Sequence, residues 1–153
     1  MIEEGQTAPE FELQSDGGET VKLSDFRGRP VVLYFYPKDD TPGCTAEACE
    51  FRDAYDVFRD RGAEVLGVSP DDVASHQRFK SKYELPFTLL ADPDHRIAEA
   101  YGVWGERTTY GRTSMGITRS TFVIDRDGRI ARAMRGIRPA GHAENVLAAL
   151  PDG

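Results

Sequence analysis

Short apolar segments alternate along the chain with longer polar segments and with turns rich in glycine, proline and aspartate. The apolar run at 31–36 is continuous and is broken by loop residues, which is typical of a buried strand. The strands expected from such runs are 31–36, 64–69 and 87–91. The helices expected between and after them are 42–61, 71–83, 94–101 and 141–150, the first of them closed by Gly62 as a C-terminal cap.

Two hairpins complete the predicted elements. Residues 11–13 and 20–23 flank the turn sequence S-D-G-G-E, and residues 120–124 and 129–135 flank D-R-D-G. A short helical turn is expected at 24–27. Alternation of strand and helix, followed by a hairpin and a helix, predicts a mixed β-sheet covered by helices on both faces.

Length and charge narrow the functional class. The chain has 153 residues without a repeat or linker sequence, so we expect one domain over 1–153. Its net charge of −7, from 26 acidic and 19 basic residues, argues against a general nucleic-acid surface. No apolar run is long enough to span a membrane, and the first residues, M-I-E-E-G-Q, are unlike a signal peptide. We expect a cytoplasmic protein whose thiols are reduced at rest.

The chain has two cysteines, Cys44 and Cys49, and the first stands where a reactive thiol is expected. Thr41 and Pro42 predict a helix start, with a hydroxyl N-cap followed by proline in the first helical position. Cys44 then falls in the first turn. Unpaired backbone N–H groups and the helix dipole favour the thiolate there, and the thiolate is the nucleophile.

Ionisation alone is not sufficient for catalysis. An ordinary thiol is a few per cent ionised at neutral pH, so complete ionisation gains only roughly 30-fold. Another group must therefore stabilise the transition state. Thr41 precedes Cys44 by three residues, so its hydroxyl can lie on the same side of the helix as the sulfur and donate to an oxygen bound there.

Three stretches of sequence resemble the peroxiredoxins. Pro37, Thr41 and Cys44 form the pattern P-x-x-x-T-x-x-C, which resembles the active-site signature of that family. The longer stretches F-Y-P-K-D-x-T-P-G-C-T-x-E-A-C-x-F-R-D, Y-G-V-W-G-E and M-G-I-x-R-x-T-F-V-I-D resemble the bacterioferritin-comigratory subfamily, also called peroxiredoxin Q. The resemblance extends from G-Q-T-A-P-E-F near the N-terminus to the last helix. Thr118 departs from it, since close relatives often carry histidine there, and this bears on substrate contacts.

The resemblance implies a role for each of five residues. Cys44 matches the peroxidatic cysteine, and Cys49 matches the resolving cysteine of members that carry both thiols in one helix. Arg119 matches the arginine that completes the site. It is always cationic, so it can hold the thiolate and the charge that develops on peroxide oxygens. Thr41 and Pro37 match the signature loop, where Pro37 would shield the sulfur without offering a competing N–H.

The resemblance also implies the fold and the reaction. The order of predicted elements is that of the thioredoxin-like fold, with an N-terminal β-hairpin extension. The implied activity is a thiol-dependent peroxidase that reduces hydrogen peroxide or alkyl hydroperoxides, with thioredoxin or a similar dithiol protein as reductant. No bound cofactor and no metal are expected, and the family favours a monomer. We expect neither a nucleic acid nor a membrane as partner.

The spacing of the two cysteines predicts a conformational change. On an ideal helix, residues five apart have Cα atoms about 8.7 Å apart, because they are separated by about 7.5 Å along the axis and roughly 140° around it. A disulfide normally needs a Cα separation within about 7 Å. After oxidation of Cys44 to a sulfenic acid, the first turn must therefore unwind before Cys49 can attack it.

Each feature also has a simpler interpretation. Two cysteines in a cytosolic chain are often buried and inert. The spacing C-x4-C is poor for zinc, and His76, His95 and His142 are far apart in sequence, so we expect them to be surface or helix-end residues. Trp104 is expected to pack rather than to contact substrate. Arg107 and Arg112 are expected to be solvated loop charges.

Two other functions remain open from the residues. A general disulfide oxidoreductase is disfavoured, because such enzymes use C-x-x-C, which can form a bridge at a helix start with little distortion. A non-enzymatic redox sensor differs from an enzyme in turnover. A sensor consumes one peroxide per protein in the presence of excess dithiol, whereas an enzyme consumes many.

Overall fold

A seven-stranded sheet with the strand order β2-β1-β5-β4-β3-β8-β9 forms the centre of the computed structural model, which describes residues 2–151. The strands are β1 (Glu12–Ser15), β2 (Thr20–Lys22), β3 (Val31–Phe35), β4 (Glu64–Ser69), β5 (Thr88–Ala91), β6 (Trp104–Thr109), β7 (Arg112–Ile117), β8 (Ser120–Ile124) and β9 (Ile130–Arg135). The helices are the 3-10 helix η1 (Leu23–Phe26) and the α-helices α1 (Pro42–Asp60), α2 (Val73–Tyr83), α3 (Arg96–Ala100) and α4 (His142–Ala149).

Strand β3 is the centre of the sheet. It runs parallel to β4 and antiparallel to β8, and β4 in turn runs parallel to β5. All five residues of β3 are buried, because helices or loops cover both of its faces. This double burial explains why the segment is continuously apolar instead of alternating between apolar and polar residues.

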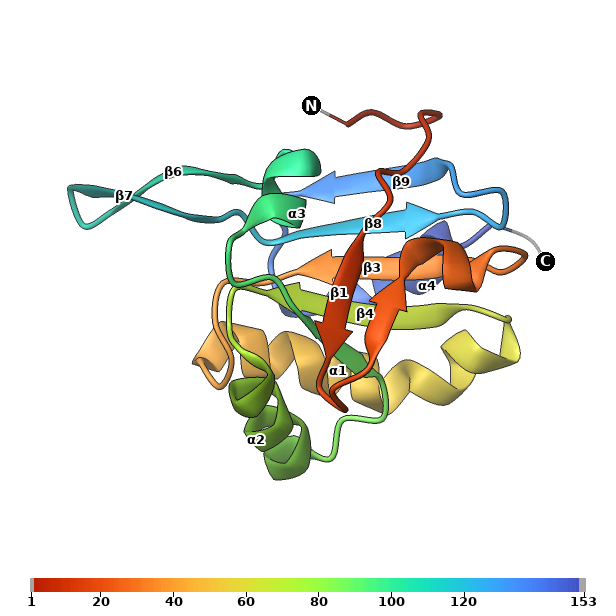
Figure 1. Ribbon diagram of the computed structural model, residues 1–153, viewed down its shortest axis with the longest axis horizontal. Helices are drawn as coiled ribbons and strands as arrows, with labels where there is room; N and C mark the ends of the chain where they lie inside the picture. Colours follow the sequence, from red (N-terminus) through yellow and green to blue (C-terminus); the bar gives the residue numbers. More distant parts are fainter. Residues whose placement is uncertain (1, 152–153) are drawn as a thin grey trace.

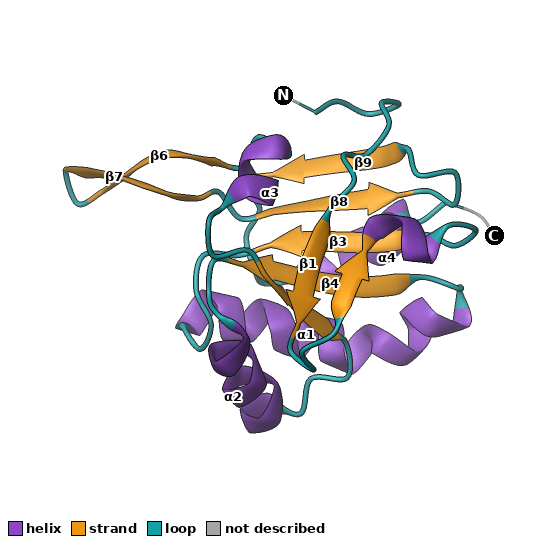
Figure 2. Ribbon diagram, in the orientation of Figure 1, coloured by secondary structure: helices purple, strands orange, loops and turns teal. Residues whose placement is uncertain are grey.

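Two hydrophobic clusters cover the two faces of the sheet, whose strands and flanking helices are shown in Figure 2. Alternate residues of β3 divide between them, with Val32 and Tyr34 on one face and Leu33 and Phe35 on the other. Helices α1, α2 and α4 supply the first cluster through Phe51, Phe58, Phe79, Ala143 and Val146. The N-terminal segment, η1 and α3 supply the second through Ala8, Phe11, Leu23 and Ala98. Helix α1 is thus held on the sheet by large aromatic residues beyond its first turn.

The predicted fold class is confirmed. The sheet is mixed, helices flank it, and strands and helices follow in the expected thioredoxin-like order (Figure 1). The expected N-terminal hairpin, β1 with β2, joins the same sheet because β1 pairs with β5. Most boundaries differ from the predicted ones by one or two residues. No helix among residues 2–151 is long and apolar enough to cross a membrane.

The prediction that Arg107 and Arg112 lie in a loop is wrong. They belong to β6 and β7, which form a separate two-stranded ribbon that projects from the body of the molecule (Figure 1). Tyr110 and Gly111 form its turn, both with positive φ, and Tyr110 is fully exposed. Solvent surrounds most of the ribbon, so its strands lack the alternation of apolar and polar residues from which strands are predicted.

Substitution of Gly67 tests how tightly side chains pack against the sheet. A Cβ atom at this position in β4 would come within 2.9 Å of Cζ and Oη of Tyr34 and within 3.0 Å of Cδ2 of Leu89. We expect Gly67→Ala to lower the free energy of unfolding by about 1–3 kcal/mol, because these buried side chains must shift. Urea unfolding of the reduced protein measures the change.

Gly105→Ala is the matched control, since a Cβ at Gly105 in β6 meets nothing within 4 Å. It should change the stability by less than about 0.5 kcal/mol. Equal effects of the two substitutions would mean that Tyr34 and Leu89 move aside without cost.

Candidate active site

Cys44 lies in the first turn of α1, as predicted. Its side chain is 1% exposed, and the helix begins at Pro42. Thr41 occupies the N-cap position with extended backbone angles, but its hydroxyl does not cap the helix. That hydroxyl donates to the carbonyl oxygen of Lys38 at 2.8 Å, so the predicted hydroxyl cap is wrong. The backbone N–H groups of the first turn are thus free of a side-chain acceptor from the N-cap.

Arg119 is the residue that the fold brings to Cys44 from a distant part of the chain. Nη2 of Arg119 donates a hydrogen bond to Sγ of Cys44 at 3.2 Å. The register of the sheet explains this contact, because Ser120 pairs with Phe35 and so places Arg119 beside the end of β3, from which the chain continues into α1. Gly43 leaves room for the guanidinium, since a Cβ there would lie 3.1 Å from Nη2. A cation therefore faces the sulfur in a partly buried site.

Glu47 is the second partner of the same guanidinium. Its Oε1 accepts from Nη1 of Arg119 at 2.6 Å, and its side chain is fully buried. Oε2 of Glu47 has no hydrogen-bond partner among the described residues. Burial raises the pKa of Glu47 to about 7, although the charge and hydrogen bond of Arg119 act in the opposite direction.

The charges at the site are therefore linked. Burial acts to lower the pKa of Arg119, but the negative charges of Glu47 and Cys44 outweigh it and raise that pKa above its ordinary value. Arg119 thus stays cationic. The ionised fraction of Glu47 changes across the neutral pH range, and a protonated Glu47 leaves more of the positive charge to act on the sulfur.

Cys49 and Pro37 lie close by in sequence but do not bond to the sulfur of Cys44. Cys49 is half-buried on the same helix, and both thiols are free. Pro37 is half-buried at the start of the segment that joins β3 to α1. The structure therefore pairs Cys44 with Arg119 directly, while Thr41 and Pro37 stand in the loop that leads to it.

Glu47 was not predicted from the sequence to belong to the site. It is part of the stretch C-T-x-E-A-C, three residues after Cys44, so helical periodicity places the two side chains on one side of α1. A buried carboxylate needs a partner, and Arg119 was the available cation. Burial of Glu47 is the part that could not be predicted, because its partner Arg119 is 72 residues away in the sequence.

The prediction for the histidines is partly wrong, whereas the prediction for Trp104 is confirmed. All three histidines lie at helix starts, as expected, but His76 is fully buried and His142 is 3% exposed, so neither is a surface residue. Burial lowers the pKa of His142 to about 4, which keeps it neutral. Trp104 packs against the second cluster and stacks on His95 with ring centres 3.8 Å apart, as expected of a packing residue.

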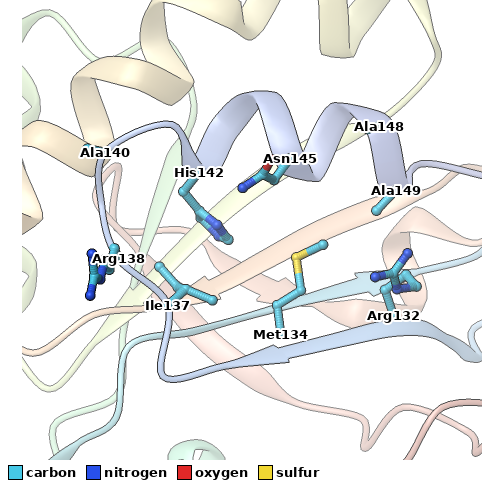
Figure 3. Close-up of a pocket in the computed structure, with 9 residues that line it drawn as sticks. All are labelled: Arg132, Met134, Ile137, Arg138, Ala140, His142, Asn145, Ala148 and Ala149. Atoms are coloured by element: carbon cyan, nitrogen blue, oxygen red, sulfur yellow. The ribbon is translucent and has the colours of Figure 1, made fainter.

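A cavity of about 590 Å³ lies between β9 and α4 (Figure 3). Its lining residues are Arg132, Met134, Ile137, Arg138, Ala140, His142, Asn145, Ala148 and Ala149. None of them is a nucleophile or a residue of the Cys44 site. Among the described residues, no group of three or more His, Cys, Asp and Glu side chains is placed to hold a metal ion.

Known proteins of one family match the sequence over almost its whole length. Residues 4–133 match the AhpC/TSA family. Peroxiredoxin Bcp of Bacillus subtilis is 51% identical over 151 residues, which cover 99% of this chain and 96% of that protein. Peroxiredoxin Bcp of Escherichia coli K12 is 44% identical over 146 residues, covering 95% and 94% of the two chains.

Solved structures agree with the sequence matches. The bacterioferritin comigratory protein of Xanthomonas campestris has a TM-score of 0.90 at 38% identity, with 96% of each chain covered. A cysteine-to-serine variant of peroxiredoxin Q from Xylella fastidiosa has a TM-score of 0.92 at 39% identity, covering 97% of this chain and 94% of that one. The chain therefore belongs to the AhpC/TSA family and is a peroxiredoxin of the Bcp and peroxiredoxin Q type, a thiol-dependent peroxidase.

Proposed function

We propose that Cys44 is the peroxidatic residue of this enzyme. Its thiolate attacks one oxygen of a hydroperoxide, the O–O bond breaks, and the leaving oxygen takes up a proton to give water or an alcohol. Cys44 becomes a sulfenic acid. The observation that carries this assignment is the 3.2 Å contact between Sγ of Cys44 and Nη2 of Arg119 at a helix start.

Arg119, Thr41 and Pro37 supply the rest of the reaction site. The guanidinium stabilises the thiolate and the charge that develops on the two peroxide oxygens, and this effect is strongest where water is excluded. Thr41 can exchange its bond to Lys38 for a bond to a peroxide oxygen, since a hydroxyl rotates freely. Pro37 has no N–H that competes for the sulfur.

Cys49 resolves the sulfenic acid in the second step. Its thiolate attacks Sγ of Cys44, a disulfide forms as the S–O bond of the sulfenic acid breaks, and the hydroxide takes up a proton and leaves as water. Both residues lie on the continuous helix α1, where ideal geometry separates their Cα atoms by about 8.7 Å. A disulfide needs about 7 Å or less, so the first turn of α1 must open. A disulfide held in a distorted segment is readily reduced.

The substrate and the reductant follow from this chemistry. The Xanthomonas campestris bacterioferritin comigratory protein has alkyl peroxide reduction activity, and we extend that substrate class, with hydrogen peroxide, to this chain. Thioredoxin or a similar dithiol protein restores both thiols. Cys44, Cys49 and Arg119 all come from one chain, which supports a monomer as the working unit. Two thiols that must return to the reduced state support a cytoplasmic location.

Exchange of each cysteine for serine separates the two steps. Cys44→Ser should abolish peroxide reduction, because it removes the nucleophile. Cys49→Ser should complete one rapid turnover and then stop, because the sulfenic acid has no internal partner. Peroxide loss in the presence of thioredoxin and its reductase measures both. An intact first turnover in Cys44→Ser would reverse the assignment, and one peroxide per protein in the unmodified chain would indicate a sensor.

Oxidation should also change the mobility of α1. In the protein with the Cys44–Cys49 disulfide, amides from Thr41 to Phe51 should exchange with solvent much faster than in the reduced protein, because the first turn has opened. Those of β3 should keep their protection. Hydrogen exchange with mass spectrometry measures both segments. Equal protection of α1 in the two states, with the intramolecular disulfide confirmed by mass, refutes the opening step.

A further inference from the structure

A buried polar network lies beneath the loop between β3 and α1. Asp39, in this loop, accepts hydrogen bonds from three side chains and is 7% exposed. Tyr36 Oη donates to Oδ1 at 2.5 Å, while Ser75 Oγ and His76 Nδ1 contact Oδ2 at 2.8 and 2.7 Å. The loop is therefore held by Tyr36, just after β3, and by the first turn of α2.

His76 is doubly protonated on geometric grounds. Its Nδ1 faces the carboxylate of Asp39, and its Nε2 faces the carbonyl oxygen of Leu90 at 2.9 Å. A carbonyl oxygen and an ionised carboxylate only accept hydrogen bonds, so with Asp39 ionised both ring nitrogens donate. Only the imidazolium has two donors. His76 and Asp39 thus form a buried ion pair, since neither has appreciable contact with solvent.

The surrounding charges agree with this state. The groups that face His76 are Asp39 of the loop, Tyr36 just after β3, Ser75 of its own helix, and Asp71 just before that helix. Burial opposes the charge on His76, but the hydrogen bond and charge of Asp39, with the Leu90 carbonyl and Asp71, outweigh it and raise its pKa. Among the described residues, none of the groups named here as facing His76 is a cation.

The loop that the network supports is strained. Asp40 has φ of +57°, in the left-handed region that residues other than glycine rarely adopt. A strained backbone persists where surrounding contacts fix it. Asp39 supplies such contacts from below, and its backbone N–H also donates to Oδ2 of Asp71 at 2.8 Å. The same loop carries Pro37 and Thr41 and leads directly to Cys44.

We propose that His76 is a positioning residue of the peroxidatic site: its imidazolium fixes Asp39, and through Asp39 the loop 37–41, in the conformation that keeps the first turn of α1 closed around Cys44. The pair therefore favours the peroxide step, which needs the closed turn, and opposes the resolving step, which needs it open. The effect on the two steps rests on the proposed function, whereas the effect on the loop does not.

Two substitutions at one position test the proposal. In His76→Asn the amide nitrogen takes the place of Nδ1 and still donates to Asp39, whereas in His76→Gln it takes the place of Nε2 and donates only towards Leu90. Hydrogen exchange of the reduced protein, without peroxide, measures the amides of 38–45. These should exchange at least tenfold faster in His76→Gln than in the unmodified protein, and by a smaller factor in His76→Asn, which keeps the hydrogen bond to Asp39 but loses the charge, with the amides of β3 unchanged in both.

Rapid-mixing kinetics measures the peroxide step and the disulfide step separately. A general loss of structure would slow both steps, whereas the proposal predicts that only the peroxide step slows. In His76→Gln, the rate constant for peroxide with Cys44 should fall at least fivefold, while disulfide formation from the sulfenic acid should be equally fast or faster. A parallel loss in both steps contradicts the proposal, as does equal exchange at 38–45 in the two variants. If the unmodified protein does not react with peroxide at Cys44 but the exchange pattern is the expected one, the catalytic assignment is wrong and the loop positioning stands.

The unmodified protein supplies a test that needs no variant. Because the pKa of His76 is raised in the folded protein, the stability that its charge gives the closed loop is fully present below the ordinary imidazole pKa. That stability is lost as the pH rises through the raised value. Exchange at 38–45, corrected for the intrinsic pH dependence of amides, should therefore rise with pH over that window. The same corrected rate at every pH would overturn the proposal. This test holds even if His76→Gln does not fold.

Discussion

The contact of one guanidinium with a sulfur and a carboxylate determines how the rest of this molecule is arranged. Arg119 reaches Sγ of Cys44 at 3.2 Å and Oε1 of Glu47 at 2.6 Å. All three groups are largely removed from water. A buried charge is costly unless it is paired. The start of β8 and the first turn of α1 are therefore held together in the reduced protein, and removal of Arg119 leaves the buried Glu47 without its partner. The pairing of β3 with β8 makes this contact possible.

The helix that carries both cysteines has two opposing requirements. The peroxide step needs the first turn of α1 formed, because the backbone N–H groups and Arg119 then face the sulfur. The disulfide needs that turn opened. Different contacts hold the two parts of the helix. Phe51 and Phe58 anchor its later turns in the core, whereas polar contacts of the preceding loop hold its start. Opening can therefore stay local, which is the behaviour expected of a segment with few buried apolar contacts.

Much of this could be predicted from the sequence. The central strands and the helix start at Pro42 follow from local patterns, and Cys44 and Arg119 were identified from residue chemistry and family resemblance. The β6–β7 ribbon was missed because most of this strand pair is exposed to water, so its strands lack the alternation of apolar and polar residues from which strands are predicted. The burial of Glu47 and His76 was missed for another reason. A charged residue is expected at the surface unless its partner is known, and here the partners are Arg119, 72 residues away, and Asp39, 37 residues away.

The most direct measurement of the central claim is the rate constant of Cys44 with peroxide as a function of pH in Arg119→Met. Arg112→Met, on the exposed β6–β7 ribbon, is the control and should match the unmodified protein. If Arg119 stabilises the transition state, the variant stays slower by on the order of a hundredfold even at pH values where its rate no longer rises, which exceeds the roughly 30-fold that thiol ionisation can explain. Convergence of the two curves at that plateau would mean that Arg119 only ionises the thiol, and would contradict the account.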